Sequence, residues 1–232
     1  MNGRAGTAPH LSSGDPAAST PRLVAWTILA GLLIAVAYSS RATGGKPDPQ
    51  VLYRWSTAVG SLIQDGVILG LVLAIARGNR GLLALRRPAG GLRTLWLLVG
   101  AIVAIYVWEG VYSLLAHPGN EQGLTPSHWE PRHAAAYVAN GVVICTFIPF
   151  VEELMFRGLG YSLLERFGRW PAIAVVGVVF GLAHGLVVSL PVIVAFGWML
   201  AWVRSRTASV VPGMVLHGTF NLIALVAAVV AN

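Results

Sequence analysis

Charged residues are scarce in this chain, and their scarcity excludes most classes of soluble protein. Only 11% of the 232 residues are charged, whereas 56% are hydrophobic. An average soluble domain carries about 25% charged residues, so this chain cannot cover a water-facing surface. We therefore exclude a soluble enzyme, a disordered protein and a coiled coil. Sixteen basic residues against nine acidic ones give a net charge of +7. In a membrane protein such an excess marks cytoplasmic loops, and no nucleic-acid partner is expected.

Cysteine and lysine each occur once. Cys145 alone excludes an intrachain disulfide and a zinc site built from cysteines. Its apolar neighbours are typical of an inert buried thiol. Because Lys46 is the only lysine, arginine supplies nearly all of the positive charge. This composition and the short loops indicate a bacterial protein of the plasma membrane.

Long apolar runs predict an all-α, polytopic membrane bundle of seven or eight helices. Residues 1–21 are rich in small residues and proline, and we expect a disordered tail there. Residues 22–132 are expected to form the N-terminal transmembrane helices, and residues 133–232 the helical core. The expected spans are 23–38, 57–76, 95–116, 133–165, 171–190, 191–203 and 210–230. As an alternative, the first run is a signal peptide, since Ala35-Val36-Ala37 resembles a cleavage site, but the long leader favours a retained helix.

Arginine clusters predict which loops face the cytoplasm. The strongest cluster, between residues 77 and 93, contains five arginines and no acid. Residues 166–169 and 204–206 each contribute two more arginines. The polar segment His117–Arg132, which carries Glu121 and Glu130, is expected outside. This pattern predicts a cytoplasmic N-terminus.

The apolar run 133–165 is too long for one straight span. As a helix it would measure about 50 Å, against a hydrocarbon core of about 30 Å. Pro149 lies inside the run. We therefore expect a break near Pro149, giving either two segments or one kinked and strongly tilted helix.

Four acidic residues lie within apolar spans, namely Asp65, Glu109, Glu152 and Glu153. Burying such a group in a bilayer costs at least about 2.5 kcal/mol, so each needs a physical reason. Asp65 and Glu109 have no charged neighbour in sequence. We expect each to pair with a residue of another helix or to line a wet cavity.

The adjacent acids Glu152 and Glu153 come with a cation. Glu153 and Arg157 are four residues apart, so they face each other on a helix and can pair. Glu152 is rotated by about 100° and lacks this local partner. One alternative is a salt-bridged helix end near the cytoplasm, with Glu152 reaching toward water.

Two histidines within apolar runs favour a functional interpretation. His184, His217 and Asn221, like Glu152, lie roughly 11 to 15 residues from the nearest arginine cluster, which places all four at a depth of about 16–22 Å. A carboxylate, two imidazoles and an amide at one level suit hydrolysis inside a membrane. The carboxylate can act as a general base, and the other groups can orient water or stabilise an oxyanion. The same four residues can alternatively hold a divalent metal such as zinc. The chain lacks a His-Glu-x-x-His motif, which excludes ordinary zincin architecture.

Three motifs in this order resemble those of the CPBP family, which includes type II CAAX prenyl endopeptidases and bacterial Abi-type proteins. The resemblance covers about residues 134–225. The matching residues are Glu152, Glu153 and Arg157 in Glu-Glu-x-x-x-Arg, Phe180 and His184 in Phe-x-x-x-His, and His217 and Asn221 in His-x-x-x-Asn. The residues before about 130 carry no such signature.

The resemblance implies a helical intramembrane endopeptidase that acts on a membrane-associated or lipidated peptide or protein. By this resemblance, Glu152 and His184 activate water, and His217 and Asn221 stabilise the oxyanion. The resemblance also implies that Glu153 and Arg157 hold the site in shape. The resemblance leaves a metalloprotease and a metal-free glutamate mechanism both open. A non-catalytic binding or bacteriocin-immunity protein is the alternative function. A transporter ranks third, because no internal repeat is found. The oligomeric state is not specified by the sequence.

Overall fold

The computed structural model describes residues 20–44, 48–117, 121, 124, 126 and 128–230. The tail expected at 1–21 lies outside this part of the chain, except for Thr20 and Pro21, which begin the first helix.

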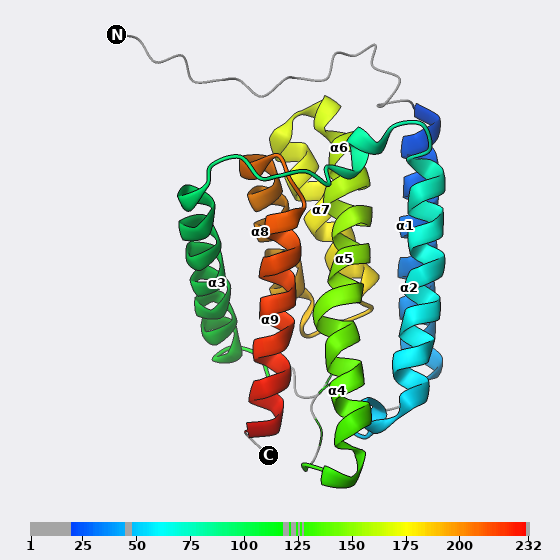
Figure 1. Ribbon diagram of the computed structural model, residues 1–232, viewed down its shortest axis with the longest axis vertical. Coiled ribbons are helices and arrows are strands. Elements are labelled where there is room, and N and C mark those ends of the chain that lie inside the picture. Colours follow the sequence, from blue (N-terminus) through cyan, green and yellow to red (C-terminus); the bar gives the residue numbers. More distant parts are fainter. Residues whose placement is uncertain are drawn as a thin grey trace.

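The described residues form seven helices and no strand, which confirms the expected all-α bundle. The separate helices are α1 (Thr20–Thr43), α2 (Trp55–Ile75), α3 (Leu92–Ser113), α7 (Arg169–Ala183), α8 (Leu190–Thr207) and α9 (Val211–Val230), and one long central helix contains α4 (Ala134–Val142), α5 (Ile148–Glu153) and α6 (Tyr161–Leu164). Short 3-10 turns lie at Val51–Tyr53, Arg80–Leu83, Pro131–His133 and Glu165–Phe167. Figure 1 shows α1 and α2 on one side of the bundle, α3 on the other, and α5 and α9 between them.

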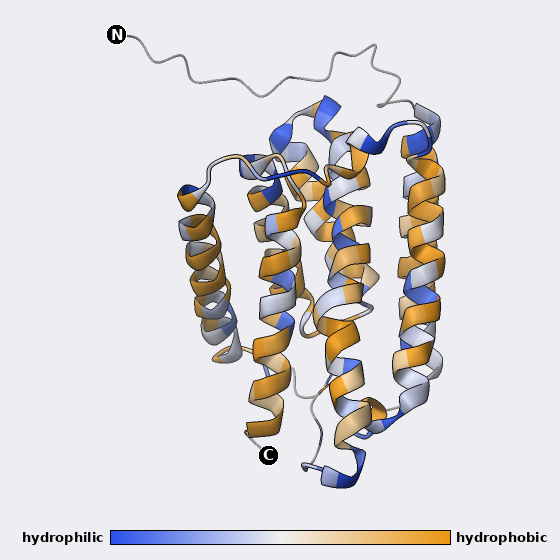
Figure 2. Ribbon diagram, viewed as in Figure 1, coloured by the Kyte–Doolittle hydropathy of each residue, from blue (hydrophilic) through white to orange (hydrophobic). Residues whose placement is uncertain are grey.

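Five helices are long and apolar enough to cross a membrane: α1, α2, α3, α9 and the central helix. Large apolar side chains such as Ile28, Val67 and Val103 are exposed on the outside of the bundle. Figure 2 shows apolar residues along the helices, with hydrophilic ones gathered at the loops and in a few bands inside. This reverses the pattern of a soluble protein, as expected for an integral membrane protein.

The central helix remains continuous past Pro149. It runs for 37 residues from Pro131 to Phe167. Of the two expected outcomes, two segments or one helix, the chain therefore adopts one helix. A π-helical segment, Val143–Phe147, directly precedes the proline. Proline cannot donate a backbone hydrogen bond, and its ring crowds the carbonyl four residues earlier, here that of Cys145. The wider π turn provides the local adjustment that a proline in a helix requires.

The helix α9 packs against this π segment at the carbonyl groups of Ile144 and Cys145. The side-chain amide of Asn221 donates to the Ile144 carbonyl at 2.8 Å. Gly218 lies so close to the Cys145 carbonyl that a Cβ atom would clash with it. A second π segment, Leu154–Gly160, follows Glu153. The two acids therefore lie in a short α-helical stretch between two π segments.

Hydrogen bonds join two of the arginine-rich loops at one end of the bundle. The backbone of Ala89 donates to Thr207 at 3.0 Å, and that of Val210 donates to Ala84 at 3.1 Å. Arg86 Nε also donates to the Ala208 carbonyl at 2.6 Å. These two arginine-rich loops therefore lie at the same end of the bundle.

The span expected at 171–190 is shorter than its apolar sequence suggested. Helix α7 ends at Ala183, and residues 184–189 form an irregular turn before α8. Its 15 residues rise by about 22 Å, which is less than the hydrocarbon core of about 30 Å. Gly185 reverses the chain with a φ of 64°, a conformation that glycine adopts readily. The turn therefore brings irregular backbone to membrane depth.

Candidate active site

The ion pair expected between Glu153 and Arg157 is present and fully buried. Arg157 Nη1 lies 3.0 Å from Glu153 Oε1, and both side chains have 0% exposure. The second guanidinium nitrogen donates to the Gly197 carbonyl on α8 at 3.0 Å. The guanidinium also stacks over the Phe180 ring at 4.1 Å. Arg157 thus joins the central helix to both α7 and α8.

The first turn of α9 lies against the same carboxylate. Nδ1 of His217 is 3.3 Å from Glu153 Oε1. A Cβ atom at Gly213 would clash with the other carboxylate oxygen, so only glycine allows this close approach. The N-terminus of a helix carries a partial positive charge, which favours an anion there. Glu153 is therefore enclosed by Arg157 of its own helix and by Gly213 and His217 of α9.

Glu152 has no partner on its own helix, as its position predicted, but it faces α9. Its Oε2 atom lies 3.6 Å from Nε2 of His217. The two nitrogens of one imidazole consequently face the two adjacent carboxylates. His217 is 4% exposed, so this contact is shielded from solvent. The imidazole connects the ion pair to Glu152.

His184 ends α7, and one hydrogen bond fixes its ring. Nδ1 lies 2.8 Å from the Phe180 carbonyl, which can only accept. This geometry puts the proton on Nδ1 and leaves Nε2 as a proton acceptor. The Phe180 ring packs edge-on against His184 at 4.6 Å and against His217 at 5.7 Å. Phe180 thus separates the two imidazoles and supports both.

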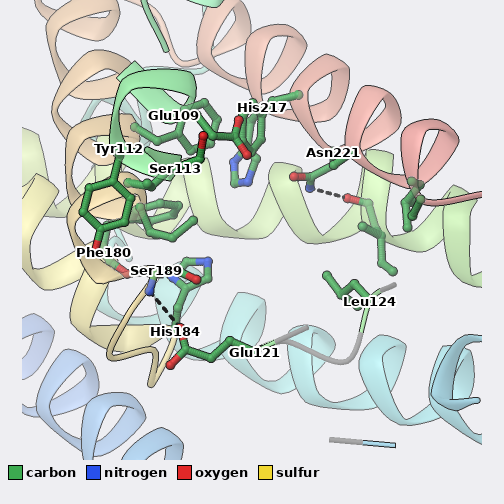
Figure 3. Close-up of a pocket in the computed structure, with 18 residues that line it drawn as sticks. Glu109, Tyr112, Ser113, Glu121, Leu124, Phe180, His184, Ser189, His217 and Asn221 are labelled. Carbon is green, nitrogen blue, oxygen red and sulfur yellow. Dashed lines mark hydrogen bonds between the residues drawn. The ribbon is translucent and has the colours of Figure 1, made fainter. Parts of the chain in front are cut away.

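Two cavities meet at His184. The first, of about 270 Å³, is lined by Glu109, His184, His217 and Asn221 together with aromatic side chains. Figure 3 shows the two imidazoles facing this cavity, with Asn221 held on one side.

The second cavity, of about 660 Å³, is lined by Asp65, Glu152 and His184 among mainly apolar side chains of α1 and α2. Of the two alternatives expected for Asp65 and Glu109, pairing with another helix or lining a cavity, the structure shows the second, with one acid in each cavity.

The six candidate residues thus fall into one contacting group and two flanking residues. Direct contacts join Glu152, Glu153, Arg157 and His217. The flanking residues share cavity walls with this group: His184 with both Glu152 and His217, and Asn221 with His217.

Glu121 is the site-lining residue that the sequence pattern missed. The sequence suggested only an acid in an outside loop, whereas the structure places its carboxylate in the wall of the first cavity. Burial opposes its ionisation, but hydrogen bonds from the Ser189, Val187 and Val188 backbones outweigh burial and lower the pKa of Glu121 to about 2. The first amide that Glu121 contacts, that of Val187, lies 66 residues further along the chain. No sequence pattern links an acid in a loop to so distant a turn.

The four residues considered as metal ligands do not converge as a donor set. Within the described part of the chain, no group of three or more His, Cys, Asp or Glu side chains could hold a metal ion. Nδ1 of His184 is bonded to a carbonyl, and the nitrogens of His217 face carboxylates. Asn221 uses its amide group to donate to Ile144. This arrangement does not fit a resident metal ion.

A helical membrane bundle with buried carboxylates and imidazoles around internal cavities defines the class of an integral membrane protein with a polar intramembrane site. Residues 134–223 match the family described as type II CAAX prenyl endopeptidase Rce1-like. The match contains all six candidate residues and confirms the resemblance drawn from the motifs. No curated protein and no solved structure matches the chain. The match likens this segment to a family of CAAX-type membrane proteases.

Proposed function

We propose that this protein is an intramembrane endopeptidase in which Glu152 and His184 activate water to cleave a membrane-associated or lipidated peptide. The observation that carries the proposal is that both side chains line one cavity, while His217 contacts Glu152 at 3.6 Å. The family match supports the reaction class.

In the proposed reaction, Glu152 removes a proton from water as the water oxygen attacks the scissile carbonyl. Nε2 of His184 accepts a hydrogen bond from the same water, because Nδ1 already donates to Phe180. The protonated Glu152 then gives its proton to the leaving amine as the carbon–nitrogen bond breaks. The products are a carboxylic acid, which keeps the second water proton until it ionises, and an amine.

Asn221 and His217 are proposed to stabilise the oxyanion. A side-chain amide has two N–H donors, and Asn221 uses one of them to anchor itself to Ile144. The second remains available on the cavity side. Nδ1 of His217 faces Glu153, which leaves Nε2, on the side of Glu152, to donate to the nearby oxyanion. The buried pair of Glu153 and Arg157 holds this imidazole in place.

Of the two family-level mechanisms, we propose the glutamate mechanism without a metal ion. The donor arrangement of the described residues supports it, because the nitrogens of His217 are directed at the two carboxylates. Since the second cavity is mainly apolar, a peptide attached to an apolar segment or lipid is the expected substrate. We further propose a bacterial plasma membrane with a cytoplasmic N-terminus, from the arginine pattern.

Comparison of protein termini in cell membranes tests this function. Strains carrying the native protein, Glu152→Gln and Glu130→Gln are compared at matched abundance. Glu130 is the control, because it lies in the outer loop beside His128 and outside both cavities. We expect termini that persist with Glu130→Gln and fall by about 10²–10⁴-fold in rate of formation with Glu152→Gln.

Termini that form equally in all three strains would overturn the endopeptidase proposal. A phenotype that survives Glu152→Gln would instead favour the binding or immunity alternative. The termini that depend on Glu152 would also identify the substrate.

A further inference from the structure

The backbone groups of the irregular turn at residues 184–189 lack the regular hydrogen bonds of a helix. Non-helical backbone at membrane depth is tolerated only where protein or a wet cavity satisfies its hydrogen bonds. The turn begins at His184 and ends at the N-terminus of α8. Its amides and carbonyls therefore need partners from elsewhere in the chain.

Three amide groups of this turn, those of residues 187–189, donate to one carboxylate. Glu121 Oε1 accepts from the Val187 and Val188 amides at 2.9 and 3.2 Å, and Oε2 accepts from the Ser189 amide at 2.8 Å. Arg41, in the last turn of α1, pairs with Glu121 at 2.8 Å. The Glu121 side chain is only 6% exposed. Three donors and a cation thus fix a carboxylate in a largely covered position. The lower part of Figure 3 shows Glu121 beside Ser189, whose amide is one of these donors.

Two carbonyl groups of the turn accept hydrogen bonds from tyrosines. Tyr38 on α1 donates to the Leu186 carbonyl at 3.0 Å. Tyr112 on α3 donates to the Val188 carbonyl at 2.6 Å. At Gly185 a Cβ atom would lie 3.0 Å from the backbone of Ala37, so α1 also presses directly on the turn.

These contacts come from outside the family-matched segment, whose first residue is 134. They act on the backbone that directly follows His184. The His184 ring is fixed on one side by Phe180 on its own helix. On the other side, its backbone leads into the turn that Glu121 holds.

We propose that Glu121 is a positioning residue for His184, supported by Arg41, Tyr38 and Tyr112. By holding the turn, this group of four, which we term the turn clamp, sets the direction of the His184 ring toward the water that Glu152 activates. The inference rests on the proposed function for its catalytic consequence. The clamp itself is a structural claim that can be measured separately.

The experiment uses the full chain in lipid nanodiscs, with Glu121→Gln, Glu121→Asp and the control Glu130→Gln. The first measurement is hydrogen exchange of the peptide that covers residues 185–190. Because the Glu121→Gln side chain has one acceptor oxygen in place of two, exchange at Val187–Ser189 should rise by about fivefold or more, since one lost hydrogen bond has about that effect. Glu130→Gln should leave it unchanged.

The second measurement is the rate at which diethyl pyrocarbonate modifies His184 across pH 5 to 8, with His217 as internal reference. We expect Glu121→Gln to change the His184 profile alone, and Glu121→Asp, which keeps the charge, to restore part of it. Cleavage that depends on Glu152 should fall by about tenfold in Glu121→Gln, in line with the cost of misplacing a reacting group.

Unchanged exchange in Glu121→Gln would overturn the clamp. Faster exchange with an unchanged His184 profile would overturn the positioning role and leave only a structural one. If no cleavage depends on Glu152, the proposed function fails, while exchange and His184 reactivity still decide on the clamp. If Glu121→Gln does not fold, Tyr112→Phe, which removes a single donor, should shift both measurements in the same direction by less.

Discussion

Arg157→Met should destabilise the protein by about 3–5 kcal/mol, because removing one partner leaves a buried charge uncompensated. The prediction follows from the complete burial of Arg157 and Glu153, each with 0% exposure. Three contacts are lost together: the ion pair at 3.0 Å, the bond to the Gly197 carbonyl and the stacking on Phe180. A charged hydrogen bond contributes about 1.5–3 kcal/mol and a desolvated cation–π contact about 2 kcal/mol, so their non-additive sum reaches the same range.

The double variant Glu153→Gln/Arg157→Met separates the charge from the packing. It removes the buried anion along with the cation, so only the unpaired Gly197 carbonyl and lost packing remain. These should cost about 1–3 kcal/mol. The double variant is therefore expected to be more stable than Arg157→Met alone, even though it carries one more substitution.

The assay is reversible denaturant unfolding of the purified protein in mild detergent, with both single variants and the double variant forming a cycle. A loss below about 1 kcal/mol for Arg157→Met would refute the reasoning, since that is the value of a solvent-exposed pair. A double variant that loses the sum of the two single losses would also refute it.

Other contacts lead to three more predictions. Gly213→Ala should lower the melting temperature and the cleavage that depends on Glu152, because its Cβ would clash with Glu153, whereas Gly70→Ala on α2 meets no atom and serves as control. The clamp at Glu121 should persist from pH 7 to 5, because a lowered pKa keeps its stabilisation above pH 4.5 and loses it as the pH falls toward about 2. Turn amides that lose protection already between pH 7 and 5, measured by exchange corrected for its intrinsic rate, would contradict this. Chelators should leave cleavage by the purified protein intact, whereas loss with EDTA and recovery with zinc would show that His184 and His217 rearrange around a metal.

The sequence predicts those parts of the fold that depend on local composition. Apolar runs located all seven helices, since a bilayer requires about twenty apolar residues per span. The end of α7 could not be predicted in this way, because residues 184–190 are as apolar as a helix interior. Their partners lie on α1, on α3 and in a distant loop, and these decide where the helix stops. The π segment before Pro149 was equally hidden, because proline predicts a disturbance but not its form.

The site shows the same division between local and distant information. The pair of Glu153 and Arg157 was predictable, since four residues along a helix bring two side chains together. The contact between His217 and both carboxylates depends on how α9 packs against α5. Spacing along one chain cannot indicate that packing. Counting depth along each helix brought the residues to one level without showing that Glu152 and Asn221 line different cavities, both bordered by His184.

The residues before 134, which the family match does not cover, stabilise backbone inside the matched segment. The matched segment contains the proposed reacting groups, but one of them, His184, lies at the start of the irregular turn between α7 and α8. That backbone is tolerated only with partners, and Glu121, Tyr38 and Tyr112 provide them from before residue 134. A change in these residues should therefore alter how fast the site works without altering any motif residue. The first half of the chain thus belongs to the site through the backbone it stabilises.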